Sequence, residues 1–356
     1  MNPKERFLIA LAGGIPDRIP IMEHLFSQNI MEKVLGYKTE LYDGSAQVKL
    51  ATILGIDAIW TPINGFCGIE NVPHKKDEIY VDEWGVTYRK NGWPIIAQID
   101  TPIKSRDDWN RYKMPLVHTP ERFKILRSVK QANDGDLAVI LGILGPFTMA
   151  SWYLMDFSTL AIMMYTDPEL IHQINEAVLE WTLSVVRSAI KDEGGVDCVE
   201  ISDDWGSTTS LLLSPDDFRN FFLPYLERLV KGIRQLGVPV IMHNDGKLWE
   251  ILDDIVATGI NALHPVERAA GMDLKRIKER YKGIVTPIGN VNNKITMASA
   301  DVEDVKQEVL ECIKDAGING GYIISSDHSI HDLIPIENLY CLIDTVKKYG
   351  CYPINI

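Results

Sequence analysis

The stretch Asp197-Cys198-Val199-Glu200-Ile201-Ser202-Asp203-Asp204-Trp205 decides the fold, because it is a short apolar run that ends in polar residues. Seven other stretches repeat this pattern, and the segments between them carry apolar residues at three- and four-residue spacing. Such alternation is typical of successive β-strand and α-helix units. The sequence therefore predicts an α/β fold, a single eight-stranded (β/α)8 TIM barrel over residues 1–356. The predicted strands are Ile19–His24, Asp57–Ile63, Ala138–Gly145, Asp197–Asp204, Pro239–Asp245, Ala262–Glu267, Val285–Val291 and Tyr322–Asp327.

One segment, residues 71–119, does not follow this alternation. Within it, Tyr80–Arg89 alternates with a period of two around Gly85, which predicts a β-hairpin. We interpret the segment as an insertion between barrel units. A flap over the active site and an edge hairpin that seals one end of the barrel are both consistent with it.

Composition and charge argue against several classes of function. The chain carries a formal net charge of -13, and no run of Lys or Arg stands apart from acidic residues, so we expect no nucleic-acid partner. No apolar run reaches membrane-spanning length and no leader pattern is recognisable, so we expect a cytoplasmic protein without a membrane partner. The five cysteines form no Cys-x-x-Cys pair, which favours reduced thiols. The oligomeric state stays open.

Polar residues end most of the predicted strands, where an α/β barrel places its catalytic groups. They are Glu23-His24, Ser202-Asp203-Asp204-Trp205, His243-Asn244-Asp245, His264-Pro265-Val266-Glu267, Gly289-Asn290 and Ser326-Asp327-His328. Carboxylates that converge on one cavity repel one another, so some must be protonated, hydrogen-bonded, paired with His or bound to a metal. The chain has no Gly-x-Ser-x-Gly, Walker loop or Gly-x-Gly-x-x-Gly after a strand, which argues against ester hydrolysis, phosphoryl transfer and nicotinamide chemistry.

At these residues the sequence resembles the uroporphyrinogen decarboxylase superfamily. The similar stretches are Arg6–Pro20, Asp197–Trp205, Leu213–Pro215, Phe222–Leu226, Gly259–Asp273, Asp327–Ile330, Ile334–Asn338 and Tyr349-Gly350. The resemblance covers nearly the whole chain and implies the same barrel. It also implies one of two activities: decarboxylation of the acetate arms of a tetrapyrrole, or methyl transfer to or from the cobalt of a corrinoid protein.

Two departures from the family's motifs narrow this choice. The decarboxylases carry an Arg-x-x-x-Arg element after the first strand that grips substrate carboxylates, whereas residues 21–29 contain no arginine. Methyltransferases that act on thiols hold zinc with a His-x-Cys after the fifth strand and a Cys after the eighth. Here His243-Asn244-Asp245 and Ser325-Ser326-Asp327 stand at these places, so both sulfur ligands are missing. If zinc is bound, the resemblance implies His243 and Asp245 as ligands, with Glu267 or Asp327 as a further oxygen donor.

The remaining branch of the family implies the function. It moves a methyl group from a methylated small molecule, foremost an aromatic methyl ether of the guaiacol or veratrol type, to a Co(I) corrinoid. The corrinoid is expected on a separate carrier protein, because the chain lacks the Asp-x-His-x-x-Gly with which such carriers ligate cobalt. The alternatives are transfer from methylcobalamin to tetrahydrofolate or a thiol, uroporphyrinogen decarboxylation, and a non-catalytic sensor or scaffold.

The chemistry of an aryl ether's leaving group indicates which residue types would be catalytic. A phenolate is basic, so a proton donor beside the ether oxygen would assist its departure. The predicted catalytic residues are His243 and Asp245 as the centre of the acid or Lewis-acid apparatus, with Asp203 and Asp327. The predicted substrate-binding residues are His24, Phe147, Asp204, Trp205, Asn244, Glu267 and His328. Aromatic walls for a flat ring are expected from Trp60, Phe66, Trp84, Trp93, Phe147, Trp152, Tyr153 and Trp205.

Overall fold

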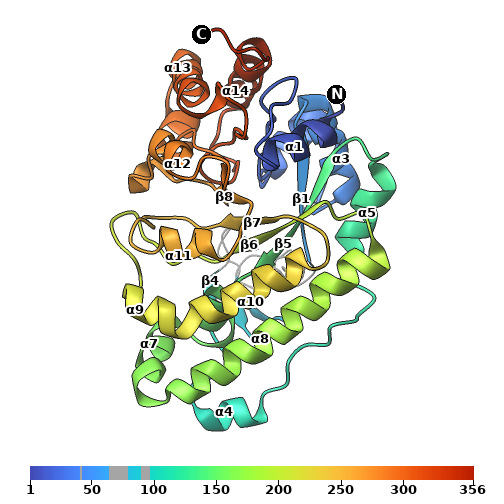
Figure 1. Ribbon diagram of the computed structural model, residues 1–356. Coiled ribbons are helices and arrows are strands. Elements are labelled where there is room, and N and C mark those ends of the chain that lie inside the picture. The colour runs from blue at the N-terminus through green and yellow to red at the C-terminus, as the bar shows by residue number, and fades with distance from the viewer. Residues whose placement is uncertain (41, 64–78, 90–96) are drawn as a thin grey trace.

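The computed structural model describes residues 1–40, 42–63, 79–89 and 97–356, and its main body is a TIM barrel (Figure 1). In these ranges the strands are β1 (Ala58–Pro62), β2 (Ile79–Val81), β3 (Thr87–Arg89), β4 (Ala97–Asp100), β5 (Ala138–Leu144), β6 (Cys198–Ser202), β7 (Val240–His243), β8 (Ala262–His264) and β9 (Thr286–Pro287). The α-helices are α1 (Pro3–Leu11), α2 (Gln28–Leu35), α3 (Gly44–Leu54), α4 (Arg106–Arg111), α5 (Lys124–Ala132), α6 (Pro146–Thr148), α7 (Phe157–Thr166), α8 (Pro168–Ser188), α9 (Pro215–Asp217), α10 (Leu223–Arg234), α11 (Leu252–Ala257), α12 (Leu274–Arg280), α13 (Val302–Cys312) and α14 (Ile336–Tyr349). Two π-helical turns, η2 (Met149–Leu154) and η6 (Asn293–Met297), follow β5 and β9.

Six parallel strands form the regular part of the barrel, in the order β1-β5-β6-β7-β8-β9. The first and last predicted strands complete the circle through isolated parallel bridges, which are Ile21–Ile324, Ile288–Ile323 and Val291–Ser326. All eight predicted strand regions therefore contribute to the wall. The predicted barrel is confirmed.

The first segment is irregular because a side chain takes the place of a backbone partner. The Asp57 carboxylate accepts the Ile21 amide at 2.7 Å, while the Asp57 amide donates to the Ile21 carbonyl. Pro20, just before, has no amide to donate to a ladder. The segment is thus held against the start of β1 without forming a regular strand.

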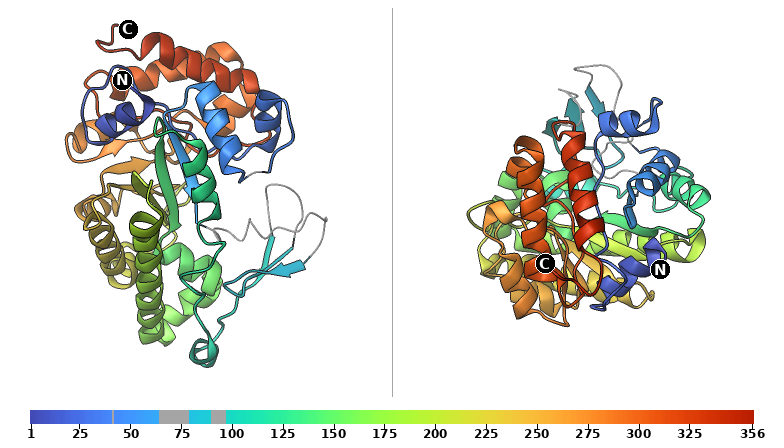
Figure 2. Two further views of the ribbon diagram at one scale, coloured as in Figure 1. Left: turned by 90° about the vertical axis from the view of Figure 1, so that its right-hand side faces the viewer. Right: turned by 90° about the horizontal axis from the view of Figure 1, so that it is seen from above.

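Capping residues set the ends of the surrounding helices. Ser27 caps α2, Asp43 caps α3 and Ser214 caps α9, each by accepting an amide of the first turn. Gly36 ends α2 with a φ of 76°, a conformation that glycine adopts without strain. The helices lie around the strands, and the chain's two ends lie on the same side of the molecule (Figures 1 and 2).

Residues that point into the barrel form a core cluster of their own. It includes Ala58 and Trp60 of β1, Ala138 and Ile140 of β5, Cys198 of β6, Ile241 of β7 and Ala262 of β8. Helix α1 closes the amino-terminal end of the barrel with Phe7, Ala10 and Leu11. Because this end is filled, a substrate can reach the interior only from the carboxyl ends of the strands.

The predicted hairpin is present and belongs to a three-stranded antiparallel sheet, β2-β3-β4, that projects from the side of the barrel (Figure 2). Asp82 accepts the amides of Trp84 and Val86 and so shapes the turn. Trp84 packs edge-on against Trp181 of α8, which anchors the sheet to the helical layer. Of the predicted insertion 71–119, residues 71–78 and 90–96 lie outside the described residues, so its limits stay a prediction.

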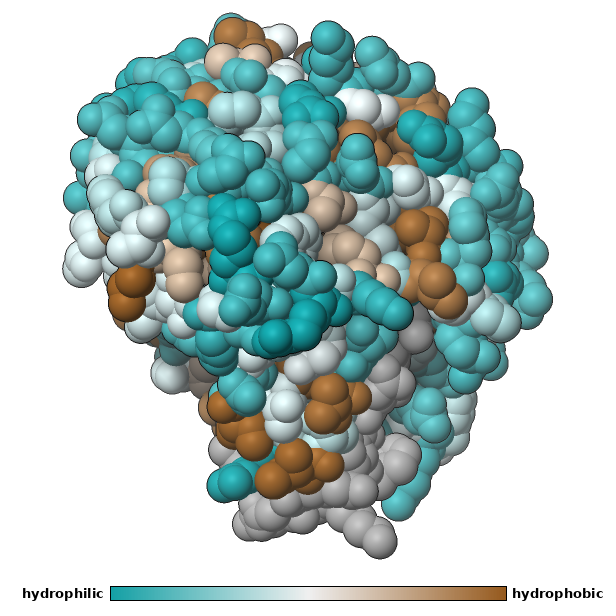
Figure 3. Space-filling view, turned by 90° about the horizontal axis from the view of Figure 1, so that it is seen from below, coloured by the Kyte–Doolittle hydropathy of each residue, from teal (hydrophilic) through white to brown (hydrophobic). Residues whose placement is uncertain are grey.

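The described helices include none with the length and apolarity that a membrane crossing requires. On the face seen in Figure 3, hydrophilic surface separates several hydrophobic spots. That face therefore shows no single broad apolar area.

Candidate active site

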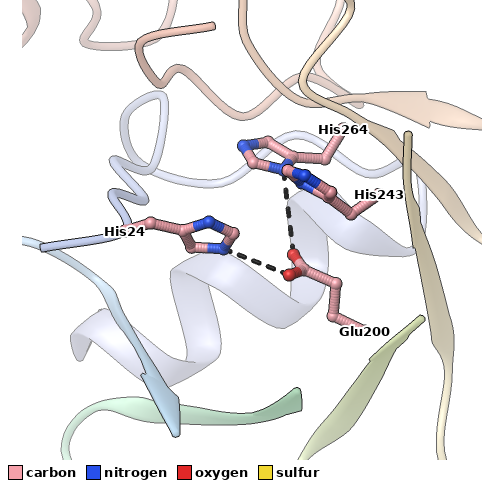
Figure 4. A group of neighbouring side chains, drawn as sticks. All are labelled: His24, Glu200, His243 and His264. Atoms are coloured by element: carbon pink, nitrogen blue, oxygen red, sulfur yellow. Dashed lines mark hydrogen bonds and ion pairs between the residues drawn. The ribbon is translucent and has the colours of Figure 1, made fainter. Parts of the chain in front are cut away.

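Four side chains meet inside the barrel, and Figure 4 shows three imidazoles around one carboxylate. They are His24, Glu200, His243 and His264, which we call the inner cluster. His24 Nε2 lies 3.2 Å from Glu200 Oε1, and His264 Nδ1 lies 3.8 Å from Glu200 Oε2. His243 Nδ1 and His264 Nδ1 are 2.7 Å apart. Each residue comes from a different segment of the barrel wall.

The alternation of side chains along each strand places the inner cluster. In β6, Cys198 belongs to the core inside the barrel, whereas Ile201 belongs to the core outside it. Glu200, two positions after Cys198, therefore points inward. His243 and His264 stand opposite each other in the register of β7 and β8.

Burial controls the charges of the inner cluster. It acts to raise the pKa of the fully buried Glu200, but the neighbouring His24 and His243 lower that pKa below its usual value. Burial also holds the pKa of His264 well below its usual value, and the nearby imidazoles act in the same direction. The cluster thus combines an ionised carboxylate with a neutral imidazole at His264.

A second group, which we call the outer group, consists of Asp204, Asp245 and His328. His328 Nε2 lies 3.2 Å from Asp245 Oδ2, and the Asp245 amide donates to Asp204 Oδ1 at 2.8 Å. His243 links the two groups, because its Nε2 lies 3.8 Å from Asp245 Oδ1 while its Nδ1 faces His264.

Within the outer group, His328 and Asp245 shift each other's pKa in opposite directions. The hydrogen bond to Asp245 raises the pKa of His328 above its usual value. Burial opposes ionisation of Asp245, but His328 and His243 lower its pKa. Burial raises the pKa of Asp204. These shifts favour an imidazolium at His328 beside a carboxylate at Asp245.

The outer group opens onto a cavity of about 380 Å³. Its described lining is Gly206, Ser207, Thr208, Asp245, Gly246, Glu267, Asn293, Lys294, His328 and His331. Glu267 accepts the Gly246 amide at 2.7 Å and lies 3.4 Å from the Lys294 ammonium. The volume suits a small molecule, and polar groups line it.

Two predicted catalytic residues, Asp203 and Asp327, bind backbone amides instead of joining these groups. Asp203 accepts the amides of Phe147 and Thr148 at 3.3 and 2.6 Å, at the start of α6. Asp327 accepts the amides of Asn293 and Arg268 at 2.7 and 3.1 Å. Burial raises the pKa of Asp203 to about 8 and that of Asp327 to about 6. Their catalytic role stays a prediction, and these contacts favour a structural one.

Three of the predicted substrate-binding residues lie in the packed core or point away from the cavity. Phe147 is 2% exposed and packs edge-on against Phe222, and Trp205 is 1% exposed and packs against Phe218. Asn244 donates from its side chain to the Asp203 carbonyl. His24, Asp204, Glu267 and His328, by contrast, belong to the inner cluster, the outer group or the cavity wall.

The predicted aromatic walls are mostly core packing. Trp60 lies beside His24, with ring centroids 5.2 Å apart, and Tyr153 is buried in the outer core. Trp84 packs on α8, and Trp152 is exposed. Phe66 and Trp93 lie outside the described residues.

Two residues of the inner cluster are not among the residues that the sequence predicts for the site. Glu200 lies within a strand and not at its end, where catalytic groups are expected. Its signal was a lone carboxylate in an apolar run, two positions from Cys198 and two from Ser202. His264 was recognised at a strand end but received no role, and its register opposite His243 is visible only in the folded barrel.

Two sets of side chains offer ligand atoms to a metal ion among the described residues. The inner cluster is one, and Asp204, His243 and Asp245 are the other. In each set the ligand atoms lie within 4.8 Å of one another. The predicted pair His243 and Asp245 belongs to the second set.

Comparison with protein families finds one that extends over most of the chain. The profile described as uroporphyrinogen decarboxylase (URO-D) matches residues 84–349. The uroporphyrinogen decarboxylase of Alkalilimnicola ehrlichii is 27% identical over 264 residues, covering 70% of this chain and 68% of that protein. The enzyme of the same name from Mannheimia succiniciproducens is 26% identical over 282 residues, covering 75% and 74%.

Solved structures support the fold over its full length. A methyltransferase from Methanosarcina mazei superposes with a TM-score of 0.74 at 21% identity, covering 98% of this chain and 99% of that one. A putative vitamin-B12 independent methionine synthase from Listeria monocytogenes gives a TM-score of 0.54 at 12% identity, covering 94% and 96%. At these identities the likeness concerns the fold.

Proposed function

Because the chain belongs to the uroporphyrinogen decarboxylase family, whose fold hosts more than one chemistry, we propose from its site that it is a methyltransferase. It moves a methyl group from an aromatic methyl ether to the Co(I) corrinoid of a separate carrier protein. The observation that carries the proposal is the His328–Asp245 pair at the wall of the cavity, 3.2 Å apart. It supplies a proton donor where a basic phenolate would leave.

The reaction requires one proton, and the outer group holds it. Co(I) on the carrier attacks the methyl carbon, the bond between methyl carbon and ether oxygen breaks, and the electron pair stays on the oxygen. His328 donates its Nε2 proton to that oxygen, and Asp245 stabilises the imidazolium before transfer. The products are a phenol and a methyl group on cobalt. His328 regains its proton from solvent, because its side chain is 49% exposed.

The charge of the cavity favours this reaction over decarboxylation of a polycarboxylate. Among the described lining residues, the acids are Asp245 and Glu267, and the lysine is Lys294. That lysine is paired with Glu267. A tetrapyrrole with several acetate arms requires cationic partners. In the described wall of this cavity, His328 and Lys294 are each already paired with a carboxylate, so neither is left to bind acetate arms.

The mouth of the barrel offers a surface on which the carrier would dock. Segments that follow four of the eight strands expose a large apolar side chain: Trp152 in η2, Leu212 after β6, Ile295 in η6 and Leu333 in the last loop. Exposed apolar side chains around a cavity are typical of a protein interface. Docking here would bring the cobalt in line with the methyl group.

A zinc ion is the alternative source of leaving-group activation. His243 and Asp245, with Asp204, would hold it, and it would act as a Lewis acid on the ether oxygen. We favour proton donation, because Asp245 is already paired with His328.

A panel assay tests the proposed function. The purified chain is mixed with a Co(I) corrinoid carrier and, one at a time, with guaiacol, veratrol, a methylamine, a betaine and a methyl thioether. We expect the methyl-cobalt absorption spectrum with an aryl ether and release of the matching phenol. Absence of methyl-cobalt with every donor, or release of CO2 from a uroporphyrinogen, would contradict the proposal.

A further inference from the structure

We propose that the inner cluster, His24, Glu200, His243 and His264, binds one divalent transition-metal ion of the zinc class. The site lies deeper in the barrel than the outer group that we assign to proton donation. It differs from the His243–Asp245 pair that the family resemblance implies. It does not depend on the proposed methyl transfer, because it rests only on the positions and chemistry of the four ligands.

The spacing of the ligand atoms suits such an ion. Two ligands in a tetrahedral zinc site, each about 2.1 Å from the metal, are roughly 3.4 Å apart. The ion-pair distances from Glu200 to His24 and His264 are 3.2 and 3.8 Å, on either side of this value. The two Nδ1 atoms of His243 and His264, at 2.7 Å, need to part slightly. All four ligand atoms lie within 4.8 Å of one another.

The charge of the site calls for a cation. The Glu200 side chain is fully buried, and its ion-pair partners within the described ranges are the imidazoles of His24 and His264, with no Lys or Arg among them. A buried carboxylate without a positive partner is strongly disfavoured. Three imidazoles and one carboxylate form a nitrogen-rich donor set that zinc, iron, cobalt and nickel accept, whereas calcium and magnesium prefer all-oxygen sites.

The two nitrogens of His243 separate the inner site from the outer group. Nδ1 faces His264, while Nε2 faces Asp245 toward the cavity. An ion on Nδ1 would therefore fix the ring and hold Nε2 toward Asp245, the partner of the proton donor His328. His243 becomes a positioning residue between the bound ion and the outer group.

Metal content and variants test the site. The purified full chain is stripped with a chelator, loaded with Zn²⁺ or Co²⁺, dialysed and measured by elemental analysis and by visible absorption of Co²⁺. We expect close to one ion per chain. Glu200→Gln and His264→Gln should weaken binding at least tenfold. The matched controls Asp204→Asn and Asp245→Asn alter the outer group and should keep the ion, because they leave the inner ligands in place.

A measurement on the unaltered chain tests the site even if the variants fail to fold. X-ray absorption of the zinc-loaded protein should show about three imidazole ligands and no sulfur. One imidazole, or loss of the ion in Asp245→Asn but not in Glu200→Gln, would place the metal in the outer group and overturn the proposal. No bound ion in the loaded protein would also overturn it. Because no methyl donor or carrier is present, these outcomes are independent of the panel assay.

Discussion

Asp203 and Asp204 are neighbours in sequence, yet their side chains bind different parts of the molecule. Asp204 accepts the Asp245 amide, whereas Asp203 accepts the two amides at the start of α6. Gly145 is part of the same fit, because a Cβ there would come within 2.3 Å of the Asp203 carboxyl. Asp203 thus supports the backbone around the site, whereas Asp204 belongs to the outer group.

The contacts of Asp203 predict an effect on stability. Asp203→Ala leaves two amides without their acceptor, so we expect a loss of about 2–4 kcal/mol in the free energy of unfolding. Asp203→Asn keeps one acceptor oxygen and should lose less. Denaturant unfolding monitored by circular dichroism measures both. If Asp203→Ala instead abolished methyl transfer at unchanged stability, Asp203 would be catalytic as the sequence predicted.

Asp245 carries the corresponding prediction for activity. Asp245→Ala removes the carboxylate that holds His328 protonated and oriented, so we expect methyl transfer to fall about 10²–10⁴-fold. The measurement is the rate of methyl-cobalt formation at saturating ether. Asp332→Ala, which removes a carboxylate that accepts the Ser27 hydroxyl at the start of α2, is the control and should stay near the wild-type rate. Near-wild-type turnover of Asp245→Ala would remove Asp245 from the mechanism.

At the scale of elements, the inserted sheet is held in place by buried polar contacts at its turn. Asp82 accepts two amides of that turn and the hydroxyl of Tyr88. The nearly fully buried Arg122 binds Glu83 and lies over the ring of Trp181 in α8. The sheet is therefore tied to the barrel's helical layer independently of the strands of the barrel.

Asp82 makes the stability of the chain depend on pH. Burial raises its pKa to about 6 in the folded state from a model-peptide value near 4. As pH rises through this window, the unfolded chain releases the proton first, so this group's contribution to stability falls by up to about 2 kcal/mol. Asp82→Asn cannot ionise, so its stability relative to wild type should rise between pH 4 and pH 7.

Urea unfolding at several pH values between 4 and 7 checks this expectation. Asp107→Asn, at an exposed position of the nearby α4, is the matched control and should run parallel to wild type. Parallel curves for Asp82→Asn and wild type would show that Asp82 does not titrate in this range.

At the scale of the whole molecule, one ionic network closes the amino-terminal end of the barrel. Arg6 of α1 binds Asp57 before β1 at 2.6 Å and Asp17 at 2.6 Å. Arg18 binds the same Asp57 at 2.9 Å. Asp57 is fully buried, so its charge depends on these two arginines.

Removing one arginine should therefore destabilise the barrel as a whole. Arg6→Met keeps most of the packing but leaves Asp57 with a single cation, and we expect a loss of about 3–5 kcal/mol in the free energy of unfolding. Thermal and urea unfolding measure it. Arg228→Met breaks an exposed pair with Glu176 and should cost less than about 1 kcal/mol. If both variants lost the same free energy of unfolding, the Arg6–Asp57 pair would not stabilise the closed amino-terminal end of the barrel.

The amino-acid sequence by itself determined the barrel and the end at which its site lies. Apolar runs with polar ends recur eight times, and this periodicity is local, so it can be read without a structure. It also indicated His24, His243, Asp245 and His328 as residues of the site. The inserted hairpin was likewise visible in its period of two.

Only the tertiary structure decided which polar residues meet. Glu200 joins three imidazoles because neighbouring strands align in register. Asp203, just past the end of β6, instead accepts amides at the start of α6. Which partner each ring nitrogen of His243 faces also depends on the fold: Nδ1 faces His264 and Nε2 faces Asp245. Pairing between strands is set by packing of the whole barrel, so it leaves no local signal in the sequence.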